Sequence, residues 1–131
     1  MALLCVEDLD HLVLNVADIK VTCRFYQRVL GMTPFMFGNG RTALSFGSRK
    51  INLYEVGQPY SPQPDKPLPG TAELCFLSRT PVVELLDHLK AENVAVEEGP
   101  VRREGALGPI TSVYFRGPDG NMIEVANYTE A

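Results

Sequence analysis

The chain has 131 residues, of which 45% are hydrophobic and 21% charged, and its net charge is −4. This composition indicates one globular domain that buries a core without needing disulfides or a structural metal. The negative charge and the scattered basic residues argue against a nucleic-acid partner, and no apolar run is long enough to cross a membrane. Three cysteines without metal-site or disulfide spacing lead us to expect a protein of the reducing cytoplasm.

The first half of the chain predicts one β-α-β-β-β unit, over residues 7–57. Residues 9–16 alternate between apolar and polar positions as a strand does, and a helix follows that begins after Asp18 and ends at Gly31. Three short apolar stretches separated by glycine-rich turns complete the unit, at residues 33–37, 41–46 and 50–56.

A proline-rich segment, residues 58–69, separates this unit from a second one over residues 70–131. Its five prolines can neither continue a helix nor join a β ladder, so we interpret it as a stiff linker. The second unit begins again with a strand and with a helix capped by Thr80 and ended by Asn93. Its predicted strands and loop are a first strand at 71–77, a strand at 94–98, a glycine-rich loop at 99–109, and strands at 111–115 and 121–128.

The two units repeat in register. The opening strand, the helix cap and the helix end each recur 62 residues later, as His11 and Glu73, Asp18 and Thr80, and Gly31 and Asn93. The closing strands also match, residues 51–53 with 123–125, at an offset of 72. An internal duplication explains this pattern. We therefore predict an α+β fold in a single domain, residues 1–131, in which two tandem βαβββ modules form a curved mixed sheet around a cleft with the helices outside.

Four polar residues occupy equivalent positions on the strand face that turns away from the helices. They are His11, Asn52, Glu73 and Glu124, on the first and last strands of each module. Two carboxylates beside a histidine on an apolar surface repel each other unless a proton or a cation lies among them. We therefore predict that His11, Glu73 and Glu124 bind a divalent metal. Ni, Mn, Fe, Zn and Mg are the candidates, and the oxygen-rich ligand set favours Mn, Mg, Fe or Ni.

Residues 9–18, the helix end at 25–32 and the closing segment 113–124 resemble the vicinal oxygen chelate superfamily. This superfamily includes glyoxalase I, methylmalonyl-CoA epimerase, extradiol dioxygenases and bleomycin-binding proteins. The resemblance covers nearly the whole chain and is nearest to small glyoxalase-domain proteins, lactoylglutathione-lyase-like or virulence-associated. It implies Asn52 as a fourth position at the metal and a homodimer, whose modules pair within a chain or by exchange between chains.

Two positions depart from the family pattern. Glu73 replaces the usual histidine, and Asn52 replaces the acid that abstracts a proton in glyoxalase I. What the resemblance implies is a lyase or isomerase of the lactoylglutathione-lyase-like class, which binds a small vicinal-oxygen or thiol-adduct substrate and stabilises an enolate or oxyanion. Glu124, Tyr54 and Tyr114 are then the candidate catalytic residues, and the loop at 102–108 is expected to close over the substrate.

Other interpretations remain open. His11 and Glu73 are also compatible with ordinary strand positions, Cys75 with a small buried hydrophobic residue, and His88 with a solvated helix residue. The changes at Asn52 and Glu73 are equally compatible with a metal-free protein that sequesters a drug or metabolite, as bleomycin-resistance relatives do. A regulatory module with neither property is the third alternative.

Overall fold

The computed structural model of the protein describes residues 3–129. The elements in chain order are β1 (His11–Val16), α1 (Ile19–Leu30), β2 (Thr33–Phe37), β3 (Arg41–Phe46), β4 (Arg49–Glu55), β5 (Glu73–Leu77), α2 (Val82–Ala91), β6 (Glu98–Gly105), β7 (Gly108–Arg116) and β8 (Met122–Tyr128). This order confirms the α+β class and the two tandem βαβββ modules. Within the described residues, no helix has both the length and the apolar character needed to cross a membrane.

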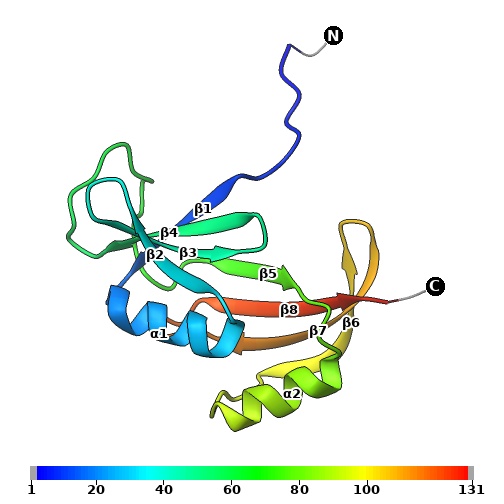
Figure 1. The fold of residues 1–131 in the computed structure, drawn as a ribbon. Coiled ribbons are helices and arrows are strands. Elements are labelled where there is room, and N and C mark those ends of the chain that lie inside the picture. The colour runs from blue at the N-terminus through cyan, green and yellow to red at the C-terminus, as the bar shows by residue number, and fades with distance from the viewer. Residues whose placement is uncertain (1–2, 130–131) are drawn as a thin grey trace.

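The strands form two separate four-stranded mixed sheets with the same internal order. The first sheet has the order β1-β4-β3-β2 and the second has β5-β8-β7-β6. In each sheet the first and last strands of the module pair in parallel, and the other neighbours pair antiparallel. Figure 1 shows α1 packed below the first sheet and α2 below the second, so the helices lie on one side of the sheets. The shared strand order supports the internal duplication.

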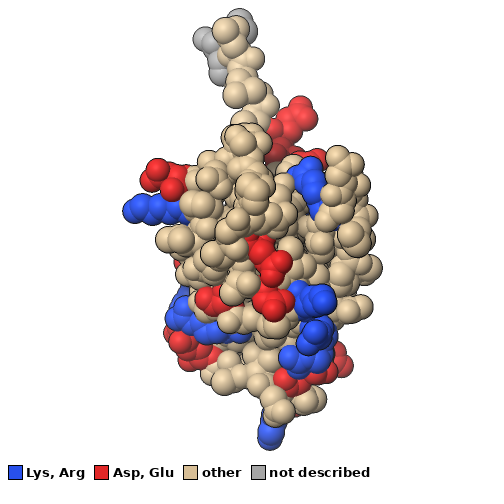
Figure 2. All heavy atoms as spheres, turned by 90° about the vertical axis from the view of Figure 1, so that its left-hand side faces the viewer, with Lys and Arg blue, Asp and Glu red and all other residues tan. Residues whose placement is uncertain are grey.

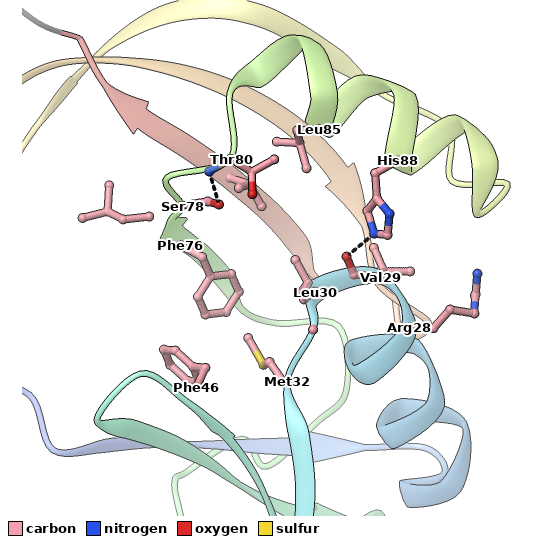
Figure 3. A pocket seen from close by; sticks show the side chains of 13 residues that line it. Arg28, Val29, Leu30, Met32, Phe46, Phe76, Ser78, Thr80, Leu85 and His88 are labelled. Atoms are coloured by element: carbon pink, nitrogen blue, oxygen red, sulfur yellow. Dashed lines mark hydrogen bonds between the residues drawn. The ribbon is translucent and has the colours of Figure 1, made fainter.

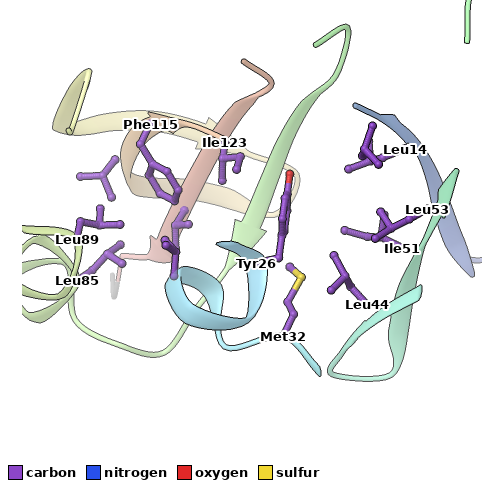
Figure 4. Close-up of a cluster of buried hydrophobic side chains, with 14 residues drawn as sticks. Leu14, Tyr26, Met32, Leu44, Ile51, Leu53, Leu85, Leu89, Phe115 and Ile123 are labelled. Atoms are coloured by element: carbon purple, nitrogen blue, oxygen red, sulfur yellow. The ribbon is translucent and has the colours of Figure 1, made fainter. Parts of the chain in front are cut away.

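One contiguous core joins the two modules. Leu44 and Ile51 of the first sheet are fully buried and lie opposite Tyr26 of α1, while Phe115 and Ile123 of the second sheet lie on the other side of that helix (Figure 4). Side chains of a strand alternate between the two faces of a sheet. In each sheet one face packs against the helices and the core, and no helix of residues 3–129 covers the other face (Figure 1). This second face is called the open face below.

The helix ends show which local signals the sequence carried. The Asp18 carboxylate accepts a hydrogen bond from Val21 N at 3.1 Å, and Gly31 closes α1 in the left-handed conformation with φ 68°, as predicted. Asn93 is left-handed as well, with φ 58°. The prediction that Thr80 caps α2 is wrong, because the helix begins after Pro81 with no side-chain cap. The backbone of Thr80 instead bonds to Ser78 Oγ and to the Asn127 side chain.

The second half of module 2 differs most from the prediction. Residues 94–97 form no strand, and the expected glycine-rich loop is instead β6 and the beginning of β7, joined by a tight turn between Gly105 and Gly108. The loop expected to close over a substrate is therefore a hairpin. Gly99 allows close packing of the two strands, since a Cβ at this position would lie 2.5 Å from the carbonyl oxygen of Ser112. From the sequence alone, a glycine-rich strand has the same composition as a glycine-rich loop.

Candidate functional site

The structure brings the four predicted ligands together two by two. His11 is paired with Lys50 across β1 and β4, and Asn52 lies two residues further along β4, so His11 and Asn52 are diagonal neighbours on the open face of the first sheet. Glu73 and Glu124 are diagonal neighbours in the same way on β5 and β8. The described residues contain no group of three His, Cys, Asp or Glu side chains placed to hold a metal ion. One chain thus presents two equivalent pairs of candidate ligands, called half-sites below.

Glu124 is the better fixed carboxylate of the second-sheet half-site. The hydroxyl of Ser112, which is completely buried, donates a hydrogen bond to Glu124 Oε2 at 2.5 Å. A charge-assisted bond of this kind holds a carboxylate in one orientation. Glu124 also lines a hollow of about 440 Å³ together with Cys75 and Tyr114. The Cys75 residue is exposed, but neighbouring side chains partly cover its sulfur; this partial burial raises the pKa of the thiol to about 11, and the neighbouring Glu124 adds to the rise, so the thiol is protonated at neutral pH.

Tyr114 pairs with Glu124 across β7 and β8, and together with Arg103 it lines both hollows that contain a carboxylate of this pair. Arg103 Nε donates to Tyr114 Oη at 3.0 Å, and Arg103 also forms an ion pair with Glu98 at 3.3 Å. Burial raises the pKa of Tyr114, and the Arg103 guanidinium lowers it in part, so the phenol keeps its proton and can donate it in a hydrogen bond. The exposed Glu73 lines the adjoining hollow with both residues.

The first-sheet half-site contains a histidine and a buried amide. His11 Nδ1 lies 2.8 Å from the Asp10 carboxylate, which leaves Nε2 available. A carboxylate bound to the far nitrogen of a histidine is the usual support for a metal-binding imidazole. Asn52 is 3% exposed, and its Oδ1 is buried without a hydrogen-bond partner among the described residues. Such an oxygen costs about 1–3 kcal/mol, which a cation or a donor would relieve, so the residues present fit a divalent ion in kind.

Tyr54, the third candidate catalytic residue, is held by the linker. Its ring stacks on Tyr60 with centroids 3.8 Å apart and an interplanar angle of 4°. Tyr60 in turn donates to the Asn15 side chain at 3.1 Å, and Arg41 donates to Tyr54 Oη at 2.8 Å. The proline-rich segment, which Figure 1 shows beside the first sheet, therefore covers one end of its open face. The Tyr54 hydroxyl accepts from Arg41, and its O–H group can donate to a ligand.

Several site residues were not found from the sequence. Ser112 carries no motif, and only its place on the same face as Tyr114 could have suggested a role.

Two expectations about other residues are wrong. Cys75 is exposed on the open face and not a buried hydrophobic residue, because it alternates with the core-facing side chains of β5. His88 is not simply solvated, since its Nε2 lies 2.8 Å from the carbonyl oxygen of Val29 at the end of α1.

A third hollow lies on the helix side, apart from the half-sites. Figure 3 shows it between the end of α1, the beginning of α2 and the facing rings of Phe46 and Phe76, whose centroids are 5.4 Å apart. Its volume is about 440 Å³, and Met32 and Leu85 add to its apolar wall. No predicted ligand or catalytic residue lines this hollow, so it does not belong to the candidate metal centre.

The surface charge is mixed. On the face shown in Figure 2, acidic and basic side chains lie among uncharged residues, often next to each other. The ion pairs of the described residues include Arg28 with Glu92 and Arg116 with Glu97, with N–O distances of 2.8 and 3.1 Å. A mixed surface lacks the single-sign field that attracts nucleic acids.

The comparisons with known proteins agree with this architecture. The family model of the Glyoxalase/Bleomycin resistance protein/Dioxygenase superfamily matches residues 8–125. The chain belongs to this superfamily. It is 44% identical over 123 residues to Virulence protein STM3117 of Salmonella typhimurium, covering 94% of this chain and 85% of that protein. It is 46% identical over 128 residues to Glyoxalase domain-containing protein RDO1 of Mycosarcoma maydis, covering 98% of this chain and 72% of that protein.

Solved structures share the fold of this superfamily member. An integron cassette protein from the mobile metagenome of V. cholerae has a TM-score of 0.95 at 48% identity and covers 98% of this chain and 100% of its own. Two more distant structures share the fold alone. They are a lactoylglutathione lyase from Agrobacterium tumefaciens, with a TM-score of 0.71 and 22% identity, and the antibiotic binding protein TnmS3 from a Streptomyces species, with a TM-score of 0.75 and 17% identity. The resemblance found in the sequence is thereby confirmed.

Proposed function

We propose that the protein is a divalent-metal-dependent enzyme of the glyoxalase-like type, a lyase or isomerase acting on a small vicinal-oxygen or thiol-adduct substrate. The observation that carries the proposal is the equivalence of the two half-sites. One offers an imidazole supported by Asp10 and an amide oxygen without a partner, and the other a carboxylate held by a buried serine. The first-sheet pair supplies a nitrogen ligand but no negative charge, and the second-sheet pair supplies negative charge but no nitrogen ligand.

A complete site requires pairing of half-sites. Because the described part of one chain does not gather the four side chains, we propose that the protein acts as a homodimer. The first-sheet pair of one copy would face the second-sheet pair of another. His11, Glu73 and Glu124 would then hold the ion, with Asn52 as a fourth ligand. Each site would belong to two chains, so dilution would weaken metal binding.

The residues of the chain suggest separate tasks in the reaction. A divalent ion, when bound, acts as a Lewis acid toward two adjacent substrate oxygens. Asn52 cannot accept a proton, so proton transfer falls to a carboxylate, and Glu124 is the one held in place by Ser112. Tyr114, positioned by Arg103, and Tyr54, positioned by Arg41, donate hydrogen bonds to the oxygen on which negative charge develops.

A second candidate is a metal-free protein that sequesters a drug or metabolite. The amide at Asn52 and the exposed Glu73 favour it, because they replace the residues that glyoxalase I uses at these positions. The fold shared with an antibiotic binding protein is compatible with this function. Such a protein would contain no metal after purification, and an organic ligand would raise its melting temperature.

Metal analysis separates the two candidates. The full chain, purified without chelator, is expected to contain about one divalent ion per chain, measured by mass spectrometry of the metals. Glu124→Gln should lose this ion, whereas Glu84→Gln, on the exposed face of α2, should keep it. A wild-type protein that stays metal-free after incubation with Mn, Ni, Fe and Zn ions would contradict the enzyme proposal and favour sequestration.

A further inference from the structure

The residues before β1 form an arm that stands clear of the body. Residues 3–9, called the arm below, are all exposed, and Figure 1 shows them extending away from the sheets on the side opposite the helices. Leu4 and Val6 are 78% and 79% exposed, and Leu3 and Leu9 are exposed as well. Apolar side chains that gather on one exposed segment indicate an interaction surface.

The base of the arm is fastened to the first sheet. Asp8 forms an ion pair with Arg49 of β4, and its carboxylate also accepts a hydrogen bond from Leu9 N at 2.8 Å. Asp10 in turn bonds to His11, the first residue of β1. The arm therefore leaves the body beside the imidazole of the first-sheet half-site, so a partner that meets this imidazole also meets the arm.

The second sheet has an exposed apolar surface at one end. Leu107, in the turn of the β6–β7 hairpin, is 89% exposed, and its backbone N donates to Tyr128 Oη at 3.1 Å. Tyr128 and the exposed Leu77 end β8 and β5 and line the same two hollows. Leu77, Leu107 and Tyr128 are called the hairpin surface below. One of these hollows also contains Glu124, so it joins the second-sheet half-site to the hairpin surface.

The arm is long enough to reach the hairpin surface of a second copy. In the proposed pairing of half-sites, His11 of one copy lies beside Glu124 of another. Neighbouring strands are about 4.8 Å apart, so β6 lies about 10 Å from β8, whereas residues 3–7 span about 16 Å when extended. Within one chain, Val6 and Leu107 are both exposed, so the arm does not cover its own hairpin.

We propose that the arm docks on the hairpin surface of a second copy of this chain. Leu4 and Val6 pack against that surface, and the arm lies across the opening of the hollow that contains Glu124. In a twofold dimer each copy gives one arm and receives one, so the contact forms twice. This inference rests on the proposed function, because the pairing of half-sites brings the arm to its docking surface. The second copy thus supplies a cover for the site as well as ligands.

Sedimentation velocity of the full chain over a range of concentrations tests the contact. The double variant Leu4→Ser and Val6→Ser should dimerise at least about tenfold more weakly, and so should Leu107→Ser, because each loses apolar surface buried between copies. These side chains are exposed in the single chain, so the variants should keep the wild-type circular dichroism spectrum. Val83→Ser, at an exposed valine of α2, is the matched control and should dimerise like the wild type.

A disulfide between copies tests where the arm docks. One chain keeps Cys5 of the arm and carries Cys75→Ser, and the other carries Cys5→Ser, Cys75→Ser and Ala106→Cys in the hairpin turn. After the two chains are mixed and oxidised, mass spectrometry should find position 5 of one copy joined to position 106 of the other. With Val83→Cys in place of Ala106→Cys, no disulfide to position 5 is expected.

Three outcomes would overturn the proposal: a wild-type protein that stays monomeric, arm variants that dimerise as tightly as the wild type, and a dimer without the disulfide between positions 5 and 106. Metal analysis of the same samples separates this proposal from the metal proposal. A dimer joined through the arm that contains no metal would contradict the metal-dependent function and support the arm contact. A metal-loaded dimer that Leu4→Ser and Val6→Ser leave unchanged would support the function and contradict the arm contact.

Discussion

Ser112→Ala tests whether Glu124 is held in place for a metal. The Ser112 hydroxyl is fully buried and donates to Glu124 Oε2 at 2.5 Å. A hydrogen bond to a charged group contributes about 1.5–3 kcal/mol, and each 1.4 kcal/mol corresponds to a tenfold change in affinity. We therefore expect metal affinity to fall by about 10- to 100-fold. Because Glu124 is only partly buried, water can replace the lost donor, and the free energy of unfolding should fall by only about 1 kcal/mol.

The assay for this variant is a competition between the protein and a fluorescent chelator, with urea unfolding measured in parallel. Thr111→Val changes the neighbouring position of β7, which faces the opposite side of the sheet, and should leave metal affinity unchanged. A folded Ser112→Ala protein with wild-type metal affinity would show that this hydrogen bond does not hold Glu124 for a metal. An equal loss in Thr111→Val would do the same, because it would show that the effect belongs to the strand and not to the hydroxyl.

Three further predictions concern the fold and the buried amide. Burial raises the pKa of Tyr26 from 10.0 to about 12, so the contribution of this phenol to folding stability should be complete below pH 10 and decrease by about 3 kcal/mol as pH rises toward 12. In urea unfolding, Tyr26→Phe should show a decrease between pH 10 and 12 that is smaller than that of the wild type. Gly99 has φ 116°, and a Cβ there would lie 2.5 Å from a carbonyl oxygen, so Gly99→Ala should lower the free energy of unfolding by more than about 3 kcal/mol in the same assay. Gly47 lies in open space, so the control Gly47→Ala should lower it by only about 1 kcal/mol. Asn52→Leu removes a buried oxygen that has no partner among the described residues. The free energy of unfolding should therefore stay the same or rise, while metal affinity falls. A clear loss of stability would show that the amide oxygen has a partner.

The duplication can be recognised from the sequence because it depends on local signals. Alternating strands, the Asp18 cap and the left-handed positions at Gly31 and Asn93 each depend on a few neighbouring residues. Equivalent positions in two copies of such a unit must have equivalent surroundings. Glu73 and Glu124 are therefore expected on one face of one sheet, where the structure has them.

The errors concern segments whose structure depends on distant partners. β6 is rich in glycine and charge and forms a strand because β7 pairs along it, which no local pattern reveals. Thr80 is a good cap by residue type, but bonds to Ser78 and Asn127 decide its conformation. The burial of Cys75 was predicted wrongly because burial of a strand face depends on what covers it.

Periodicity and the repetition of one unit are properties of the amino-acid order alone, and they predict the kinds of elements, their order and the equivalence of the four polar positions. Which side chains meet depends on how the strands pair and pack. The bond between Ser112 and Glu124, the stacking of Tyr60 on Tyr54, and the division of the four polar positions between two sheets all depend on strand register and packing between residues far apart in the chain.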